Sequence, residues 1–167
     1  RYDAEARRHT AMAQSAGGNP NRSTGGGMSM HCRRLATLNT ESAATLRELA
    51  KHHTALAGGS ASTAPRDAAR FEAGVGAPAP TQAELTALAA KAATPADHRA
   101  LQEYFVTLAK RYTAEATEHT AIAMSYRGTR IAQAADHCDR LVANARESAK
   151  EATVAAAMHQ QLANVAR

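Results

Sequence analysis

Apolar side chains recur at alternating steps of three and four residues along four stretches of the chain, at positions 2–12, 28–56, 98–126 and 134–162. Steps of this size place the apolar residues on one face of an α-helix. We therefore predict four long amphipathic helices, each of which turns one stripe of side chains toward a common core. The stripes also contain histidines, cysteines and glutamates, which ordinary cores rarely bury.

Capping residues mark two further helix starts. Thr81 and Glu84 have the spacing of a capping box, in which each side chain binds the backbone N–H group of the other residue, and they predict a short helix. Thr94 precedes Pro95, and Asp97 follows at the position of the first turn. Because a hydroxyl N-cap followed by proline is typical of a helix N-terminus, we expect the third long helix to begin here.

An internal repeat organises the chain. Residues 2–13 match residues 112–123 at the tyrosine, at Ala-Glu-Ala, at His-Thr-Ala and at the last alanine. Each copy continues through a turn to a His-Cys pair, which is His31–Cys32 in the first copy and His137–Cys138 in the second. A further histidine follows each cysteine after 21 residues. Matching residues with the same internal spacing indicate duplication of a helical hairpin.

The predicted fold is all-α, an antiparallel four-helix bundle made of two duplicated hairpins. Hairpin 1 covers 1–58 and hairpin 2 covers 94–167, while the connector 59–93, rich in Pro, Gly and Ala, holds the short extra helix. We expect a long Gly-rich turn at 15–27 and a tight turn at 125–130. In an up-down-up-down bundle both turns lie at the same end, which would bring the two His-Cys pairs together.

The composition agrees with this fold and argues against several classes of protein. Alanine dominates, tryptophan is absent and aromatic residues make up 4% of the chain, so close-packed helices are favoured over a sheet. The net charge is +5, but the arginines are scattered without a basic block, so we expect no nucleic-acid partner. No apolar run approaches the roughly 20 residues of a membrane span. The chain starts at Arg1 inside a helical pattern, which indicates a processed, trimmed or incompletely covered N-terminus.

The site expected at the turn end is a cluster of metal-binding side chains. Its ten members are His9, His31, Cys32, His119, His137, Cys138, Met12, Met28, Glu5 and Glu115. Burial of so many ionisable groups without a ligand would be costly. Imidazole, thiolate and thioether together suit copper, above all copper(I), whereas imidazole and thiolate alone also suit zinc.

Three alternatives stay open for this cluster. Two histidines from different helices could hold a b-type haem, although large side chains that pack a porphyrin are scarce. A carboxylate-bridged di-metal centre could use Glu5 and Glu115, although each glutamate precedes its histidine by four residues rather than three. A disulfide between Cys32 and Cys138 would require Cα atoms within about 7 Å across a bundle diagonal.

A second, weaker cluster is expected at the opposite end of the bundle, roughly 30 Å away. It consists of His53, His98 and His159. These side chains could form a three-histidine metal site, or they could only cap and pack the bundle end. We find no set of nucleophile, base and orienting residue in the sequence, so we do not predict an enzyme.

The chain resembles Ala-rich exported proteins of proteobacteria that have no assigned function. The resemblance rests on His9-Met12-Ala13, on Met28-His31-Cys32-Leu35 and on Leu49-Ala50-His53. The second half departs from it, with Ile122 and Ala134 at the methionine positions. The resemblance implies a helical bundle and a periplasmic address. More loosely, the chain is similar to four-helix-bundle copper-handling proteins.

These patterns together predict a periplasmic four-helix-bundle protein that binds, stores or delivers copper. The first alternative is a haem-binding electron carrier with two histidine ligands. The second is an interaction subunit with structural histidines, which would bind a protein partner or a second copy of this chain. The fold alone does not choose among these functions, so the choice depends on the site.

Overall fold

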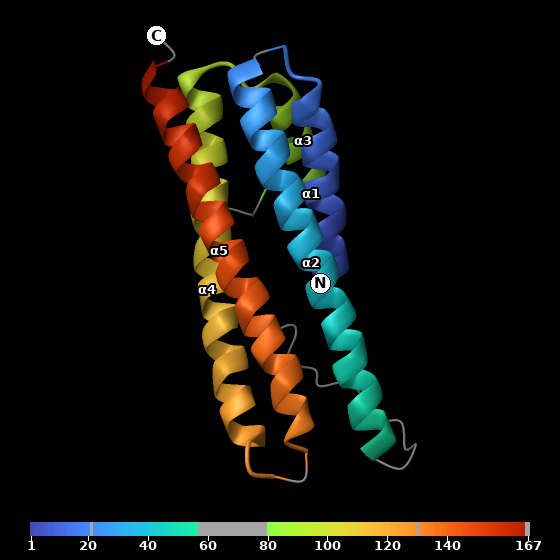
Figure 1. Ribbon diagram of the computed structural model, residues 1–167. Helices are drawn as coiled ribbons and strands as arrows, with labels where there is room; N and C mark the ends of the chain where they lie inside the picture. The colour runs from blue at the N-terminus through green and yellow to red at the C-terminus, as the bar shows by residue number, and fades with distance from the viewer. Residues whose placement is uncertain (21, 57–79, 130, 166–167) are drawn as a thin grey trace.

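The computed structural model describes residues 1–20, 22–56, 80–129 and 131–165, and five helices make up its regular structure (Figure 1). They are α1 (Tyr2–Gly17), α2 (Arg22–Leu56), α3 (Gln82–Lys91), α4 (Pro95–Tyr126) and α5 (Gln133–Val165). No strand occurs in the described residues, and the all-α prediction is confirmed. Most of the predicted connector, residues 59–79, lies outside the described part of the chain.

Both predicted capping sites are present. The Thr81 hydroxyl accepts a hydrogen bond from the backbone N–H of Glu84, and the Glu84 carboxylate accepts one from the backbone N–H of Thr81 at 2.7 Å. Thr94 and Asp97 form the same reciprocal pair at the start of α4, with Pro95 in the first helical position. These local signals fix where the two helices begin because they satisfy N–H groups that a helix cannot satisfy itself.

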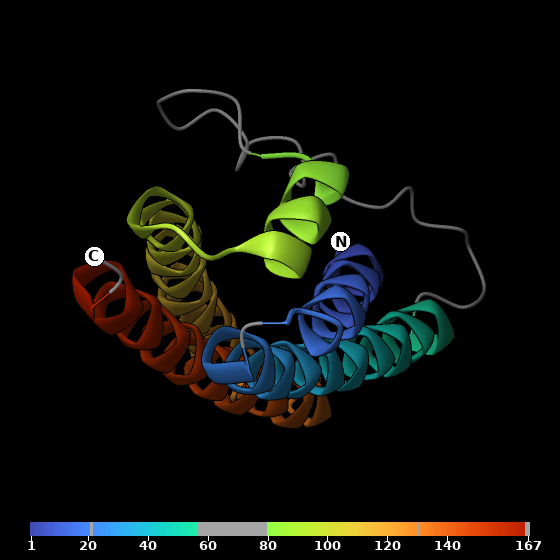
Figure 2. The same ribbon diagram turned by 90° about the horizontal axis from the view of Figure 1, so that it is seen from above.

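The four long helices form a curved layer, and α3 covers part of its concave side (Figure 2). Along the layer α1 packs on α2, α2 on α5, and α5 on α4, while α3 packs mainly on α1. Each neighbour in the layer runs antiparallel to the next (Figure 1). Within the described residues no Cα atom of α1 lies within 8 Å of one in α4, so only side chains span the interior between these two helices.

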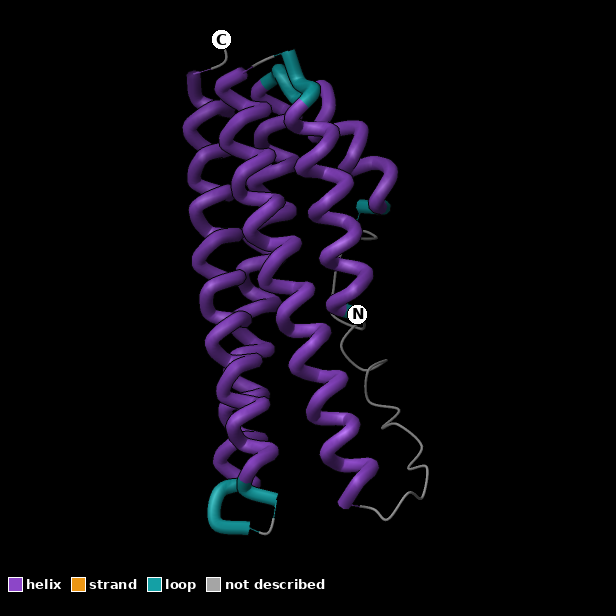
Figure 3. Tube along the Cα trace, turned by 45° about the vertical axis from the view of Figure 1, so that its right-hand side comes forward, coloured by secondary structure: helices purple, strands orange, loops and turns teal. Residues whose placement is uncertain are grey.

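The two hairpin turns lie at opposite ends of the molecule, so the predicted placement at one end is wrong (Figures 1 and 3). The α1–α2 turn lies beside the start of α4 and the end of α5, whereas the α4–α5 turn lies at the far end. In that second turn Gly128 has φ of +78°, a left-handed conformation that glycine adopts without steric cost. The two copies of the repeat therefore point in opposite directions, with their turns at opposite ends of the molecule.

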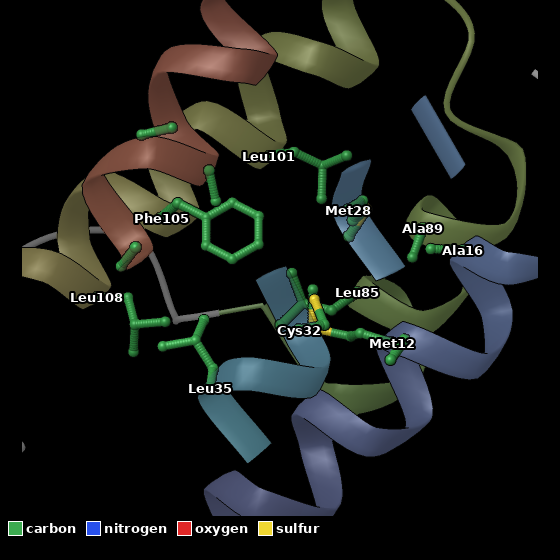
Figure 4. Close-up of a cluster of buried hydrophobic side chains, with 14 of the residues drawn as sticks. Met12, Ala16, Met28, Cys32, Leu35, Leu85, Ala89, Leu101, Phe105 and Leu108 are labelled. Atoms are coloured by element: carbon green, nitrogen blue, oxygen red, sulfur yellow. The ribbon is translucent and has the colours of Figure 1, made fainter. Parts of the chain in front are cut away.

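Large side chains that precede the repeat in α4 account for this arrangement. Leu101, Phe105 and Leu108 are buried in one core cluster with residues near the α1–α2 turn (Figure 4). The facing part of α5 contributes the small residues Ala152 and Ala155 to the same cluster. Pairing large side chains of one helix with small ones of the next gives dense packing, which the alanine-rich turn end of hairpin 2 does not offer.

The Gly-rich segment predicted as a turn belongs largely to a helix. α2 begins at Arg22, so the turn between α1 and α2 is much shorter than the predicted 15–27. Gly27 lies against α5, where a Cβ atom would come within 2.5 Å of the Met158 sulfur. Glycine at this position leaves room for the Met158 side chain of α5, although glycine has a low helix propensity.

No helix among the described residues has both the length and the apolar character needed to cross a membrane.

Candidate functional site

The structure divides the predicted ten-residue cluster between the two ends of the molecule. Cys32 belongs to the large core cluster near the α1–α2 turn, whereas Cys138 packs with Ala123 and Leu49 near the α4–α5 turn. Leu49 lies 17 residues after Cys32 in the same helix, which corresponds to about 25 Å. The two His-Cys pairs therefore do not form one site.

The same separation excludes the alternative of a disulfide between Cys32 and Cys138. Cys32 and Cys138 are free and buried, and a disulfide requires Cα atoms within about 7 Å. Of the predicted cluster, His9, Met12, Met28, His31 and Cys32 stay in hairpin 1, whereas His119, His137 and Cys138 lie in hairpin 2. Glu5 and Glu115 meet in the middle of the molecule.

The second predicted cluster is also divided, and two of its three histidines come together. His98, in the first turn of α4, and His159, near the end of α5, are both buried and face each other. His53 lies near the α4–α5 turn instead, where its Nε2 atom is 3.5 Å from the hydroxyl of Tyr126. Of the three histidines of this cluster, only His98 and His159 therefore lie together.

The His98 and His159 rings meet through their Nδ1 atoms. These atoms are 3.3 Å apart, while the ring centroids are 5.5 Å apart and the ring planes differ by 26°. The centroid separation exceeds the nitrogen separation by 2.2 Å, about twice the radius of an imidazole ring. Each Nδ1 atom thus lies close to the line between the two rings, so the rings meet nitrogen to nitrogen rather than face to face.

Burial keeps both imidazoles of this pair neutral. Desolvation lowers the pKa of His159 to about 3, with smaller contributions from the nearby His98 and His31, and desolvation also lowers the pKa of His98. One neutral ring can donate a single hydrogen bond to the other. The Nε2 atom of His159 is buried without a hydrogen-bond partner, and such an orphaned polar group calls for a structural or functional explanation.

The histidines of the two His-Cys pairs have different partners. His31 reaches from α2 to α5, where its Nδ1 atom is 2.5 Å from a carboxylate oxygen of Glu151. His137 lies near the surface, with its Nδ1 atom 2.6 Å from Nη2 of Arg140. The internal repeat gave no indication that Glu151 is the partner of His31. The counterpart of Glu151 in the first copy is Thr45, so the repeat contains no shared acidic residue at this position.

Three sulfur-containing side chains gather near the α1–α2 turn. Met12 of α1 and Met28 and Cys32 of α2 are each 0% exposed and belong to the same core cluster (Figure 4). Burial raises the pKa of the Cys32 thiol to about 12, with a smaller contribution from Glu151. The thiol is therefore protonated and unreactive at neutral pH unless a cation replaces its proton.

His9 lies one turn before Met12 on the buried face of α1. Its side chain is 0% exposed, and neither ring nitrogen has a hydrogen-bond partner. Burial lowers the pKa of His9 to about 3, with smaller contributions from Arg111 and Arg8. The nearest acidic atom, Oε2 of Glu5, is 4.0 Å from Nε2. His119, the repeat counterpart of His9, is only partly buried, and its Nδ1 atom also lacks a partner.

Glu5 and Glu115 form an ion-pair network with arginine. Arg111 of α4 extends across the interior, with Nη2 3.1 Å from Glu5 and Nε 3.5 Å from Glu115. The Tyr2 hydroxyl donates a hydrogen bond of 2.8 Å to Glu115, and Arg1 pairs with the same carboxylate. These contacts occupy the carboxylates that we predicted as metal ligands. Sequence reasoning missed Arg111, although its spacing of four residues to Glu115 was a usable signal.

Comparisons with known proteins give no further guidance, since no protein family, no curated protein and no solved structure matches the chain significantly. Among the residues that the structure describes, no three or more His, Cys, Asp or Glu side chains are grouped so as to hold one metal ion. Of the side chains predicted as metal ligands, the groups considered below are the His98–His159 pair and the sulfur group of Met12, Met28 and Cys32.

Proposed function

We propose that this protein binds copper(I) through His98 and His159. The observation that supports the proposal is that two buried, neutral imidazoles direct their Nδ1 atoms at each other across 3.3 Å. Metal binding by histidine requires the neutral ring, and the low pKa of His159 keeps this ring neutral through the physiological range. Two opposed nitrogen donors form the linear arrangement that copper(I) accepts, whereas zinc usually takes four ligands in a tetrahedron.

The fit of a metal ion between the two rings requires only a small movement. Metal–imidazole bonds are about 2 Å long, so the two nitrogens would have to be about 4 Å apart. The rings would therefore separate by less than about 1 Å from their present positions, a shift that a side-chain rotation can supply. His98 lies in the first turn of α4, at the end of the helix, so the ion would have a short path into the bundle.

Copper would act as cargo in this proposal. A site of two neutral ligands holds the ion without a charged partner, and such a site is suited to storage or delivery. The nearly touching rings do not favour haem b, because each axial histidine of a haem lies on its own side of a macrocycle. Export to the periplasm, which the sequence resemblance implied, remains a prediction.

Anaerobic titration with copper(I) against a chromophoric chelator tests the proposal. The wild-type chain is expected to take the ion from the chelator, and His159→Gln should remove one equivalent of binding. His53→Gln is the matched control, because His53 occupies the same position in the other copy of the repeat but lies at the far end. Equal copper uptake by wild type, His98→Gln and His159→Gln would refute the proposal.

A further inference from the structure

The sulfur group of Met12, Met28 and Cys32 is a second candidate for metal binding, separate from the histidine pair. The three side chains come from two helices on either side of the α1–α2 turn, and Figure 4 shows Cys32 beside Met12 in the core. Met28 and Cys32 are four residues apart in α2, so both lie on one face of that helix. The core cluster near the α1–α2 turn thus contains one thiol and two thioethers, each 0% exposed.

The second copy of the repeat has other residues at the two methionine positions. Ile122 stands at the position of Met12, and Ala134 at the position of Met28, while Cys138 keeps the cysteine. Ala134 and Cys138 are buried as well. Hairpin 2 therefore packs without sulfur at either methionine position, whereas both methionines of hairpin 1 lie in the main core cluster with Leu85 and Phe105.

His9 is a further buried group in the same part of the molecule. It lies three residues before Met12 on the buried face of α1, and both of its ring nitrogens are without hydrogen-bond partners. An imidazole in this state retains a lone pair that nothing in the described residues uses. A fully buried nitrogen donor one helical turn from Met12, together with the three buried sulfur atoms, makes up the kind of donors that soft cations select.

We infer that Met12, Met28 and Cys32 form a sulfur site for copper(I) or another soft monovalent cation, with His9 available as a fourth donor. The site uses the same metal as the proposed function but different ligands, so either one can fail alone. Binding replaces the proton of the Cys32 thiol by the metal ion: the S–H bond breaks, a sulfur–metal bond forms, and one proton is released to solvent. Neither sulfur nor metal changes oxidation state.

Silver(I) and copper(I) titrations with four variants test this inference. In the His159→Gln background, which removes the first site, the chain is expected to retain one equivalent of metal. Met12→Leu combined with Met28→Leu should remove that equivalent, and so should Cys32→Ser. Leucine nearly preserves the volume of methionine, so the double leucine variant is expected to remain folded, which its thermal unfolding curve checks.

Cys138→Ser is the matched control, because Cys138 is buried in the equivalent hairpin, in a core cluster whose described members include no methionine. It should leave metal uptake unchanged. X-ray absorption at the metal edge should show sulfur neighbours in the His159→Gln protein, and nitrogen neighbours in a double leucine variant that retains His159. Binding by the double leucine variant equal to wild type, or an absorption spectrum without sulfur in the His159→Gln protein, overturns the sulfur site and leaves the histidine site standing.

Discussion

Acid should destabilise this protein steeply, because two histidines are fully buried in their neutral form. His9 and His159 are each 0% exposed, and burial holds the pKa of each at about 3. In the unfolded chain both would return to a pKa of about 6.5. Between these two values the unfolded state binds more protons than the folded state, so the free energy of unfolding falls as the pH falls.

The magnitude follows from the size of the pKa shift. One pKa unit corresponds to about 1.4 kcal/mol, and about pH 5 lies roughly 1.5 units below the pKa of a free imidazole. Each buried histidine then costs about 2 kcal/mol of stability at that pH, and the two together cost about 4 kcal/mol relative to about pH 8. The loss continues until the pH reaches the folded-state pKa of about 3.

Urea denaturation followed by circular dichroism at the two pH values measures this difference. His159→Gln keeps a polar side chain but removes one titrating group, so the difference should fall from about 4 to about 2 kcal/mol. Met158→Leu, a change at the neighbouring residue that titrates nothing, should keep the full difference. If His9→Gln and His159→Gln both show the wild-type difference, these imidazoles are not held neutral by burial, and the reasoning fails.

Three further predictions concern the core, a helix cap and the cysteines. Phe105→Ala should lower the free energy of unfolding by about 3–5 kcal/mol, because Phe105 is fully buried in the main core, and chemical denaturation measures the loss. Thr94→Ala removes the cap of α4 and should cost about 1 kcal/mol in the same assay. Cys32 and Cys138 should resist thiol reagents in the folded state and react in urea, and oxidation of the folded protein should yield no intramolecular disulfide; rapid labelling without denaturant would contradict their burial.

The sequence predicted those features of the fold that local interactions decide. The helices at Thr81 and Thr94 begin where the capping residues indicate, because the bonds of a cap lie within one turn of the chain. The spacing of apolar residues along each helix also correctly predicted that His9, His98 and His159 are buried. A period of 3.6 residues shows which face of a helix is buried, even when the neighbouring helices are not known.

The relative direction of the two hairpins could not be predicted in this way. It depends on the packing of residues such as Met28, Phe105 and Ala155 in one core cluster, which are far apart in the sequence and are brought together by the fit of their volumes. The up-down-up-down assumption placed Cys32 and Cys138 at one end, and every ligand set based on that assumption changed with it. The expected proximity of His98 and His159 is found in the structure, because both residues belong to hairpin 2 and lie near helix ends that meet in either arrangement.

The placement of the two hairpin turns at opposite ends limits the energetic coupling between the two cysteine positions. Substitutions more than about 10 Å apart with no shared partner usually have additive effects on stability, and the environments of Cys32 and Cys138 share no core cluster. A change in the surroundings of Cys138 therefore carries little coupling free energy to the surroundings of Cys32. The two cysteine positions of the repeat can therefore differ in their chemistry independently of each other, although the two copies meet elsewhere, as at His31 and Glu151.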